Sequence, residues 1–110
     1  MTESEFVAMA EATLDDIEVS LEKAGEACDL DIECSRAGNV LEIEFIDNGS
    51  KIIINSQTPM QEIWIAAKSG GFHFRREELQ WINTRDGSEL FAALSNLVRL
   101  QSGCTVVLRP

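Results

Sequence analysis

The sequence lacks several features that would point directly to a function. Its 110 residues include no tyrosine, one histidine and two prolines, and no apolar run approaches the roughly 20 residues of a membrane span. No phosphate-binding loop, nucleophile elbow or catalytic triad pattern is present. The acidic N-terminus has neither the basic nor the apolar segment of a signal peptide. We therefore expect a cytoplasmic protein that does not associate with membranes and is not an ordinary enzyme.

Cysteine is also scarce and irregularly placed. Cys28, Cys34 and Cys104 are an odd number at wide spacing, which matches neither a disulfide framework nor a zinc site. None has a neighbouring histidine or cationic helix end that would activate it as a nucleophile. We expect all three to be reduced thiols.

Positive charge is nearly absent from the first part of the chain. Nine basic residues face nineteen acidic ones, for a net charge of −10. Residues 1–47 hold fourteen acids against Lys23 and Arg36, a balance of −12, whereas residues 48–110 balance at +2. A strongly negative protein repels phosphate backbones, so nucleic acid is excluded as a partner, whereas cations and basic proteins suit it.

Two amphipathic helices are predicted at the ends of the chain. Apolar residues recur at steps of three and four from Ser4, a candidate N-cap, to about Ala27. The spacing of Asp86 and Glu89 resembles a capping box for a second helix, which Gly103 would end. The apolar face predicted for that helix comprises Leu90, Leu94, Leu97, Val98 and Leu100.

Short strands are predicted between the two helices. Residues of alternating polarity or β-branched type form these segments, and turns are expected at 36–39, 47–49 and Gly70-Gly71. The expected strands are Asp31–Ser35, Val40–Ile46, Lys51–Ser56, Glu62–Ala67, Phe72–Arg75 and Leu79–Asn83, with Thr105–Leu108 as a short terminal strand. Both helices must bury their apolar stripes, so we predict one α+β domain over residues 1–110. It would be a two-layer α/β sandwich with both helices on one face of a five- to seven-stranded, mostly antiparallel sheet.

A stripe of carboxylates follows the first predicted helix. Glu11, Asp15, Glu18, Glu22 and Glu26 are spaced 4, 3, 4 and 4 residues apart and so share one side of the helix. Only Lys23 is close by as a counter-charge, and Asp16 and Asp29 add to the negative field. Asp31 and Glu33 alternate with apolar residues on the next strand and would converge with the stripe if that strand lies at the sheet edge beside the helix.

This carboxylate stripe has two interpretations. A solvated helix face that merely keeps the protein soluble is the simpler one. Against it, soluble surfaces usually mix both signs of charge, whereas here the acids gather with almost no base. The functional interpretation is an exposed, weak site for hard cations such as Mg, Ca, Mn and iron, which would also steer a basic partner.

The predicted central strands place an aromatic residue on the open sheet face. If Ile63 and Ile65 point to the helices, Trp64 points to solvent, with Asn55 and Gln61 near it, and exposed aromatics of this kind anchor protein interfaces. The opposite assignment, with Trp64 inside, stays open. His73 is read as a partly buried strand residue and not as a metal ligand.

Three motifs in one order resemble the frataxin family. They are Asn55-x-Gln57-x-Pro59, then Trp64, then Gly70-Gly71-Phe72-His73-Phe74, and the likeness, in particular to bacterial frataxins, extends from Ser4 through the second helix. The resemblance implies a helix–sheet–helix sandwich that weakly binds ferrous and ferric iron and acts in iron–sulfur cluster assembly, as a monomer when iron-free. It also implies a cysteine desulfurase and an iron–sulfur scaffold protein as partners, with the acidic surface docking on the desulfurase and the Trp64 surface contributing to the assembly complex.

By matching position, the resemblance implies an acidic set at Glu18, Glu22, Asp29, Asp31 and Glu33, with Asp15 and Asp16 as additions. Val19, Lys23 and Gly25 stand where relatives often carry acids, so Glu11, Asp15 and Glu26 would shift the iron site along the helix. Two other hypotheses remain. One is a pure protein-interaction module in which iron binding is incidental. The other, an iron-oxidising enzyme, has weak support because such sites need inward-facing Glu and His ligands.

Overall fold

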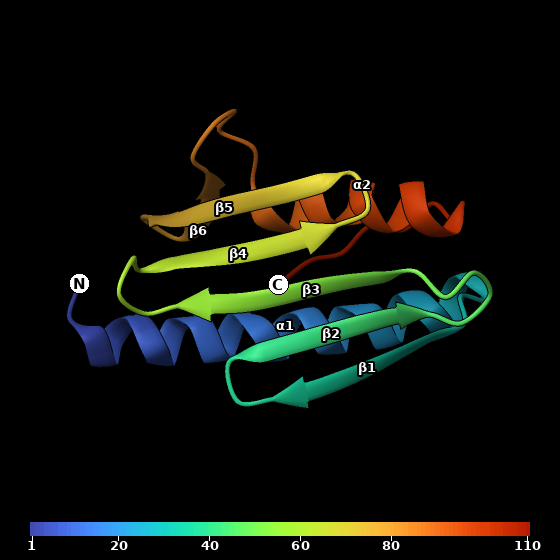
Figure 1. The fold of residues 1–110 in the computed structure, drawn as a ribbon, viewed down its shortest axis with the longest axis horizontal. Helices are drawn as coiled ribbons and strands as arrows, with labels where there is room; N and C mark the ends of the chain where they lie inside the picture. Colours follow the sequence, from blue (N-terminus) through green and yellow to red (C-terminus); the bar gives the residue numbers. More distant parts are fainter.

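A computed structural model describes all of residues 1–110 and shows two layers. A six-stranded sheet forms one layer, and the two helices cover one of its faces while the other face is open (Figure 1). The elements are α1 (Glu3–Cys28), β1 (Ile32–Ala37), β2 (Val40–Phe45), β3 (Lys51–Gln57), β4 (Glu62–Ala67), β5 (Gly70–Glu77), β6 (Gln80–Asn83) and α2 (Leu90–Ser102). The predicted α+β sandwich is confirmed.

Every strand of the sheet pairs antiparallel with the strand that follows it in the sequence, in the order β1 to β6. Tight turns make this meander possible. The β1–β2 turn has Gly38 at a φ of 59°, a conformation that glycine adopts without strain. Gly70 and Gly71, expected to form a turn, instead begin β5, and Lys68 and Ser69 make that turn.

Helix α1 begins earlier than the sequence indicated. Thr2, not Ser4, is its N-cap, and the Thr2 hydroxyl accepts from the Glu5 backbone N–H while the Glu5 carboxylate accepts from the Thr2 N–H. This reciprocal capping box satisfies two otherwise unpaired donors. At the other end, Asp29 caps the helix in a left-handed conformation with a φ of 51°. Glu5 is fully exposed, and the bonds with Thr2 hold its pKa below the usual value.

Helix α2 also differs from the prediction at its start. Glu89 itself is the N-cap and accepts from two backbone N–H groups, so the expected pairing of Asp86 with Glu89 is wrong; Asp86 instead accepts from Ser88. Gly103 ends the helix as predicted. Leu100 is exposed and does not belong to the apolar face.

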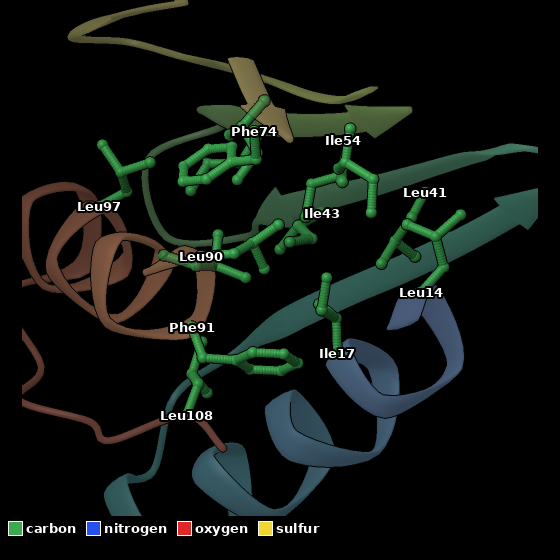
Figure 2. Packing of buried hydrophobic residues seen from close by; sticks show 14 of the residues in the cluster. Leu14, Ile17, Leu41, Ile43, Ile54, Phe74, Leu90, Phe91, Leu97 and Leu108 are labelled. Carbon is green, nitrogen blue, oxygen red and sulfur yellow. The ribbon is translucent and has the colours of Figure 1, made fainter. Parts of the chain in front are cut away.

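The core fills the space between the sheet and both helices. Figure 2 shows Leu14 and Ile17 of α1 and Leu90 of α2 directed toward strand residues such as Ile43 and Ile54. Trp81 is 2% exposed, as expected for a core residue, and its indole N–H donates to the Thr13 hydroxyl over 2.8 Å. This bond satisfies the indole N–H, which would otherwise be buried unpaired, while the Thr13 hydroxyl itself donates to the Met9 carbonyl.

The last residues form no strand, contrary to the expectation for 105–108. After α2 the chain runs back behind the sheet toward the middle of the molecule (Figure 1). Leu108 is buried in the core, and serine hydroxyls hold the backbone: Leu108 N–H donates to Ser95 and Arg109 N–H to Ser20. The serine hydroxyls thus take the backbone hydrogen bonds that a neighbouring strand would otherwise accept, since this segment lies against helices.

Two of the three cysteines are not free thiols. Cys28, at the end of α1, and Cys104, just after α2, form a disulfide with their Cα atoms 6.6 Å apart. Only Cys34 is free, so the expectation of three reduced thiols is wrong. The sequence could not show the pairing, because 76 residues separate the partners and the fold alone brings the two helix ends together.

Candidate functional site

A groove between α1 and β1 collects part of the predicted carboxylate set. It measures about 560 Å³, and Leu21, Leu30 and Ile32 are among its apolar lining residues. We call it the acidic groove, and the carboxylates that line it are Glu18, Glu22, Glu26 and Glu33. The first three share one side of α1 because of the helical repeat, and β1 lies at the sheet edge as the sequence required for convergence.

A basic residue that the sequence analysis did not pair occupies one end of the acidic groove. Arg36 of β1 points to the helix side of the sheet and its Nη1 contacts Asp15 Oδ1 at 2.9 Å and Glu18 Oε1 at 2.8 Å. Burial lowers the pKa of Arg36, but the bonds to Glu18 and Asp15 outweigh it and the pKa is raised. Arg36 thus neutralises the Asp15 end of the carboxylate stripe. Lys23 is therefore not the only counter-charge of the stripe.

Cys34 also lines the acidic groove. Its thiol is half-buried, and burial, followed by the negative charges of Glu18 and Glu22, raises its pKa to about 11. The thiol is therefore protonated at neutral pH and is a poor metal ligand and nucleophile. The groove offers oxygen ligands.

A second acidic hollow lies where α1 ends. Asp29, Asp31 and Asp47 line a pocket of about 290 Å³ beside the Cys28–Cys104 disulfide. Asp47 was not among the predicted site residues. Its position in the β2–β3 turn gave no signal in the sequence, since only the hairpin geometry brings that turn beside the end of the helix.

The remaining predicted carboxylates lie elsewhere. Glu11 lines a shallow hollow near the N-terminus with Thr2 and Glu3, and Asp16 faces the C-terminal segment on another side of α1. No three acidic, histidine or cysteine side chains are arranged so that they could hold a metal ion as they stand. A cation would therefore have to draw neighbouring carboxylates together, which suits a weak and adaptable site.

The open face of the sheet carries the predicted aromatic patch. Trp64 lies on it between Asn55 of β3 and His73 of β5, while Ile63 and Ile65 are buried on the helix side, as predicted. The Trp64 and His73 rings stack with centroids 4.3 Å apart, so His73 is an exposed partner of Trp64 and not a partly buried strand residue. Gln61 bonds to the Met1 carbonyl in a turn.

Glu62 organises this patch and was not predicted. Its carboxylate is almost completely buried, and it accepts from Trp64 Nε1 at 2.8 Å and from Arg75 Nη2 at 3.1 Å, with His73 Nδ1 at 3.5 Å. These contacts fix the orientation of the indole. The signal available in the sequence was an acid two residues before Trp64, on the same strand face.

Comparison with known proteins decides the family. The model of the frataxin-like domain matches residues 1–104. The chain belongs to the frataxin family. It is 71% identical, over 99% of its length and 97% of the relative's, to the iron-sulfur cluster assembly protein CyaY of Janthinobacterium sp. (strain Marseille).

Solved structures of frataxins confirm the fold. The frataxin of Psychromonas ingrahamii matches with a TM-score of 0.89 at 33% identity, with each chain covered in full. The trimeric frataxin of the yeast Saccharomyces cerevisiae, in a structure complexed with ferrous iron, matches with a TM-score of 0.72 at 29% identity over 86% of this chain and 85% of its own. In the frataxin described here, no helix is both long and apolar enough to cross a membrane.

Proposed function

We propose that this frataxin binds iron weakly and takes part in iron–sulfur cluster assembly, as an iron donor or as an iron-dependent regulator of a cysteine desulfurase. The observation that carries the proposal is the acidic groove, in which four carboxylates gather beside β1. Carboxylate oxygens suit ferrous and ferric iron and other hard divalent cations, and the protonated Cys34 thiol adds no soft ligand. The family supports it, since a related frataxin is known in complex with ferrous iron.

The iron-binding set we propose has its centre in the acidic groove. Glu22, Glu26 and Glu33 form it together with Glu18, whose second oxygen is not taken by Arg36. Asp29 and Asp31, with Asp47 beside them, extend it at the end of α1. Asp15 is paired with Arg36, and Glu11 and Asp16 lie outside the acidic groove. We therefore expect these three carboxylates to attract iron through their negative charge without binding it directly.

Two surfaces would then serve two protein partners. The basic surface of a desulfurase fits the acidic surface that includes Glu18, Glu22, Asp31 and Glu33, where attraction would chiefly raise the association rate. The scaffold protein would contact the open sheet face around Trp64, Asn55 and Gln61. The whole chain would act as one domain, in the cytoplasm, as a binding protein that is monomeric without iron.

A second candidate function is a pure interaction module that regulates the desulfurase while iron binding is incidental. The absence of any three side chains ready to hold a metal favours it. Under this alternative the carboxylates act only through their charge, and a cation at the groove would merely compete with the basic partner.

Amide NMR of the isotope-labelled protein tests both candidate functions, the iron-binding protein and the pure interaction module. Ferrous iron, added anaerobically, should broaden resonances of residues 18–33, and Glu22→Gln with Glu26→Gln should weaken that broadening several-fold. Glu77→Gln is the matched control, because Glu77 is an acid of β5 outside both acidic hollows. Broadening confined to Trp64 and β3–β5 would refute the iron site. If the double variant keeps its iron response but loses desulfurase binding, the interaction module is correct.

A further inference from the structure

The outer edge of β1 carries unpaired backbone groups. Ala37 and Val40 close a two-residue turn, and Ile46 N–H donates to the Asp31 carbonyl over 3.1 Å at the other end of the same pairing. Hydrogen-bonded and non-hydrogen-bonded pairs alternate along an antiparallel ladder. The N–H and C=O groups of Ile32, Cys34 and Arg36 therefore point away from β2, and no element lies beyond them (Figure 1).

This edge lacks most of the features that protect a sheet edge against pairing. Such protection comes from a short strand, a proline, a bulge, a covering element or charged side chains, and β1 has only the last of these, Glu33 and Arg36. β1 has six residues in unbroken register with β2 and contains no proline. The opposite edge is different: β6 has only four residues, and Ile82 is bridged to Glu89.

The acidic groove runs directly beside this edge. A strand added there would alternate its side chains, so that every second one points toward the helix side. Those side chains would meet the apolar residues Leu30 and Ile32 and the carboxylates Glu22 and Glu26, while the others would pass Glu33 at the rim. Arg36 neutralises carboxylates only near the β1–β2 turn, where it pairs with Asp15 and Glu18.

We propose that β1 is a docking edge, and that the partner of the acidic surface adds an extended segment of alternating basic and apolar residues as a seventh strand of the sheet. This rests on the proposed function and specifies how the basic partner is held: charge brings the segment in, and backbone hydrogen bonds fix its register. A second copy of this chain is a poor occupant, because it would bring the same carboxylates against one another.

Two synthetic peptides of equal charge test the proposal. Both have the sequence Lys-Val-Lys-Val-Lys-Val-Lys with blocked ends, and one is N-methylated at two adjacent central residues so that neither of its edges can pair. The unmodified peptide should slow amide hydrogen exchange at Ile32, Cys34 and Arg36. The methylated peptide should bind about five-fold more weakly or worse, since the N-methyl group that faces β1 removes one backbone hydrogen bond and also obstructs the close approach of the strands.

Each other outcome has a defined meaning. Equal affinity of the two peptides, with shifts in the acidic groove, would refute strand addition while leaving the acidic docking surface intact. Binding of neither peptide would refute both strand addition and the docking of basic segments, and the iron titration would still test the metal site separately. Dimerisation of the protein that excludes the peptide, seen by sedimentation, would also overturn the proposal in favour of a second copy at β1.

Discussion

Cys34 shows how the acidic groove acts on a single residue. Burial and the charges of Glu18 and Glu22 disfavour its thiolate and raise its pKa from 9.0 to about 11. Alkylation of Cys34 by iodoacetamide should therefore rise with pH to a midpoint near 11, and the variant Glu22→Gln should lower that midpoint. Because the folded-state pKa is raised, this residue's stabilising contribution is complete below pH 9 and is lost as the pH rises toward 11.

The control is Cys34→Ser, which should remove both the labelling and that part of the alkaline loss of stability. A midpoint near 9 in the native protein would contradict the assignment, because it would mean that the thiol is solvated.

Glu78 is a residue whose local conformation conflicts with its type. It has a φ of 55° in the β5–β6 turn, where Gly38 occupies the matching place in the β1–β2 turn with a φ of 59°. In both turns an arginine two residues earlier donates to the carbonyl of that residue. Glu78→Gly should raise the free energy of unfolding by up to about 1 kcal/mol, because glycine adopts this conformation without a Cβ clash.

Gly38→Ala is the matched control and should lower the free energy of unfolding by about 1 kcal/mol. Denaturant titration measures both variants, and a stabilised Gly38→Ala would show that the conformation costs nothing here.

Among the elements, the pairing of α1 with β1 determines how much of the carboxylate stripe is available. Arg36→Gln would release Asp15 and Glu18, so we expect the affinity for Mn²⁺, used as a probe, to rise roughly three- to ten-fold. The free energy of unfolding should fall by about 0.5–1 kcal/mol, because a partly buried ion pair is lost. Calorimetry and thermal melts give the two values.

Arg75→Gln is the matched control, since it removes the same charge from the open sheet face, where Arg75 contacts Glu62. Equal gains in Mn²⁺ affinity in both variants would contradict the role of Arg36 and indicate a general effect of net charge.

The elements were predictable where a pattern is local. The apolar period of α1, the alternation in β2 and β4 and the glycine after α2 each carry their own signal, and these elements were found within a few residues. Ser4 and Asp86 were wrong as caps, because several neighbouring residues can cap a helix and only the path of the chain selects one. The terminal strand failed because residues 105–108 meet serine hydroxyls and helices instead of a sheet edge.

For the whole molecule, the disulfide is the covalent link that ties the two helix ends together. It closes a loop over a sequence separation of 76 between the ends of the two helices, and in the chain-entropy account a loop of this size contributes roughly 4–5 kcal/mol. Dithiothreitol should therefore lower the denaturant midpoint of the native protein. Cys104→Ser should have the lower midpoint from the start and should not respond to the reductant.

Cys34→Ser provides the comparison, since it removes a thiol but keeps the disulfide, and it should respond to dithiothreitol like the native protein. An unchanged midpoint in reductant would mean that the two cysteines are not joined in solution.

The sequence by itself determined the α+β class, the burial of both helices, the frataxin motifs and the gathering of acids in the first 47 residues, because charge and periodicity are properties of the chain that survive any packing. Only the tertiary structure decided how those acids are divided. It placed Glu18, Glu22, Glu26 and Glu33 along one groove, neutralised Asp15 with Arg36, added Asp47 from a distant turn and joined Cys28 to Cys104. These outcomes depend on which residues far apart in sequence meet when the core closes, and no local pattern records that.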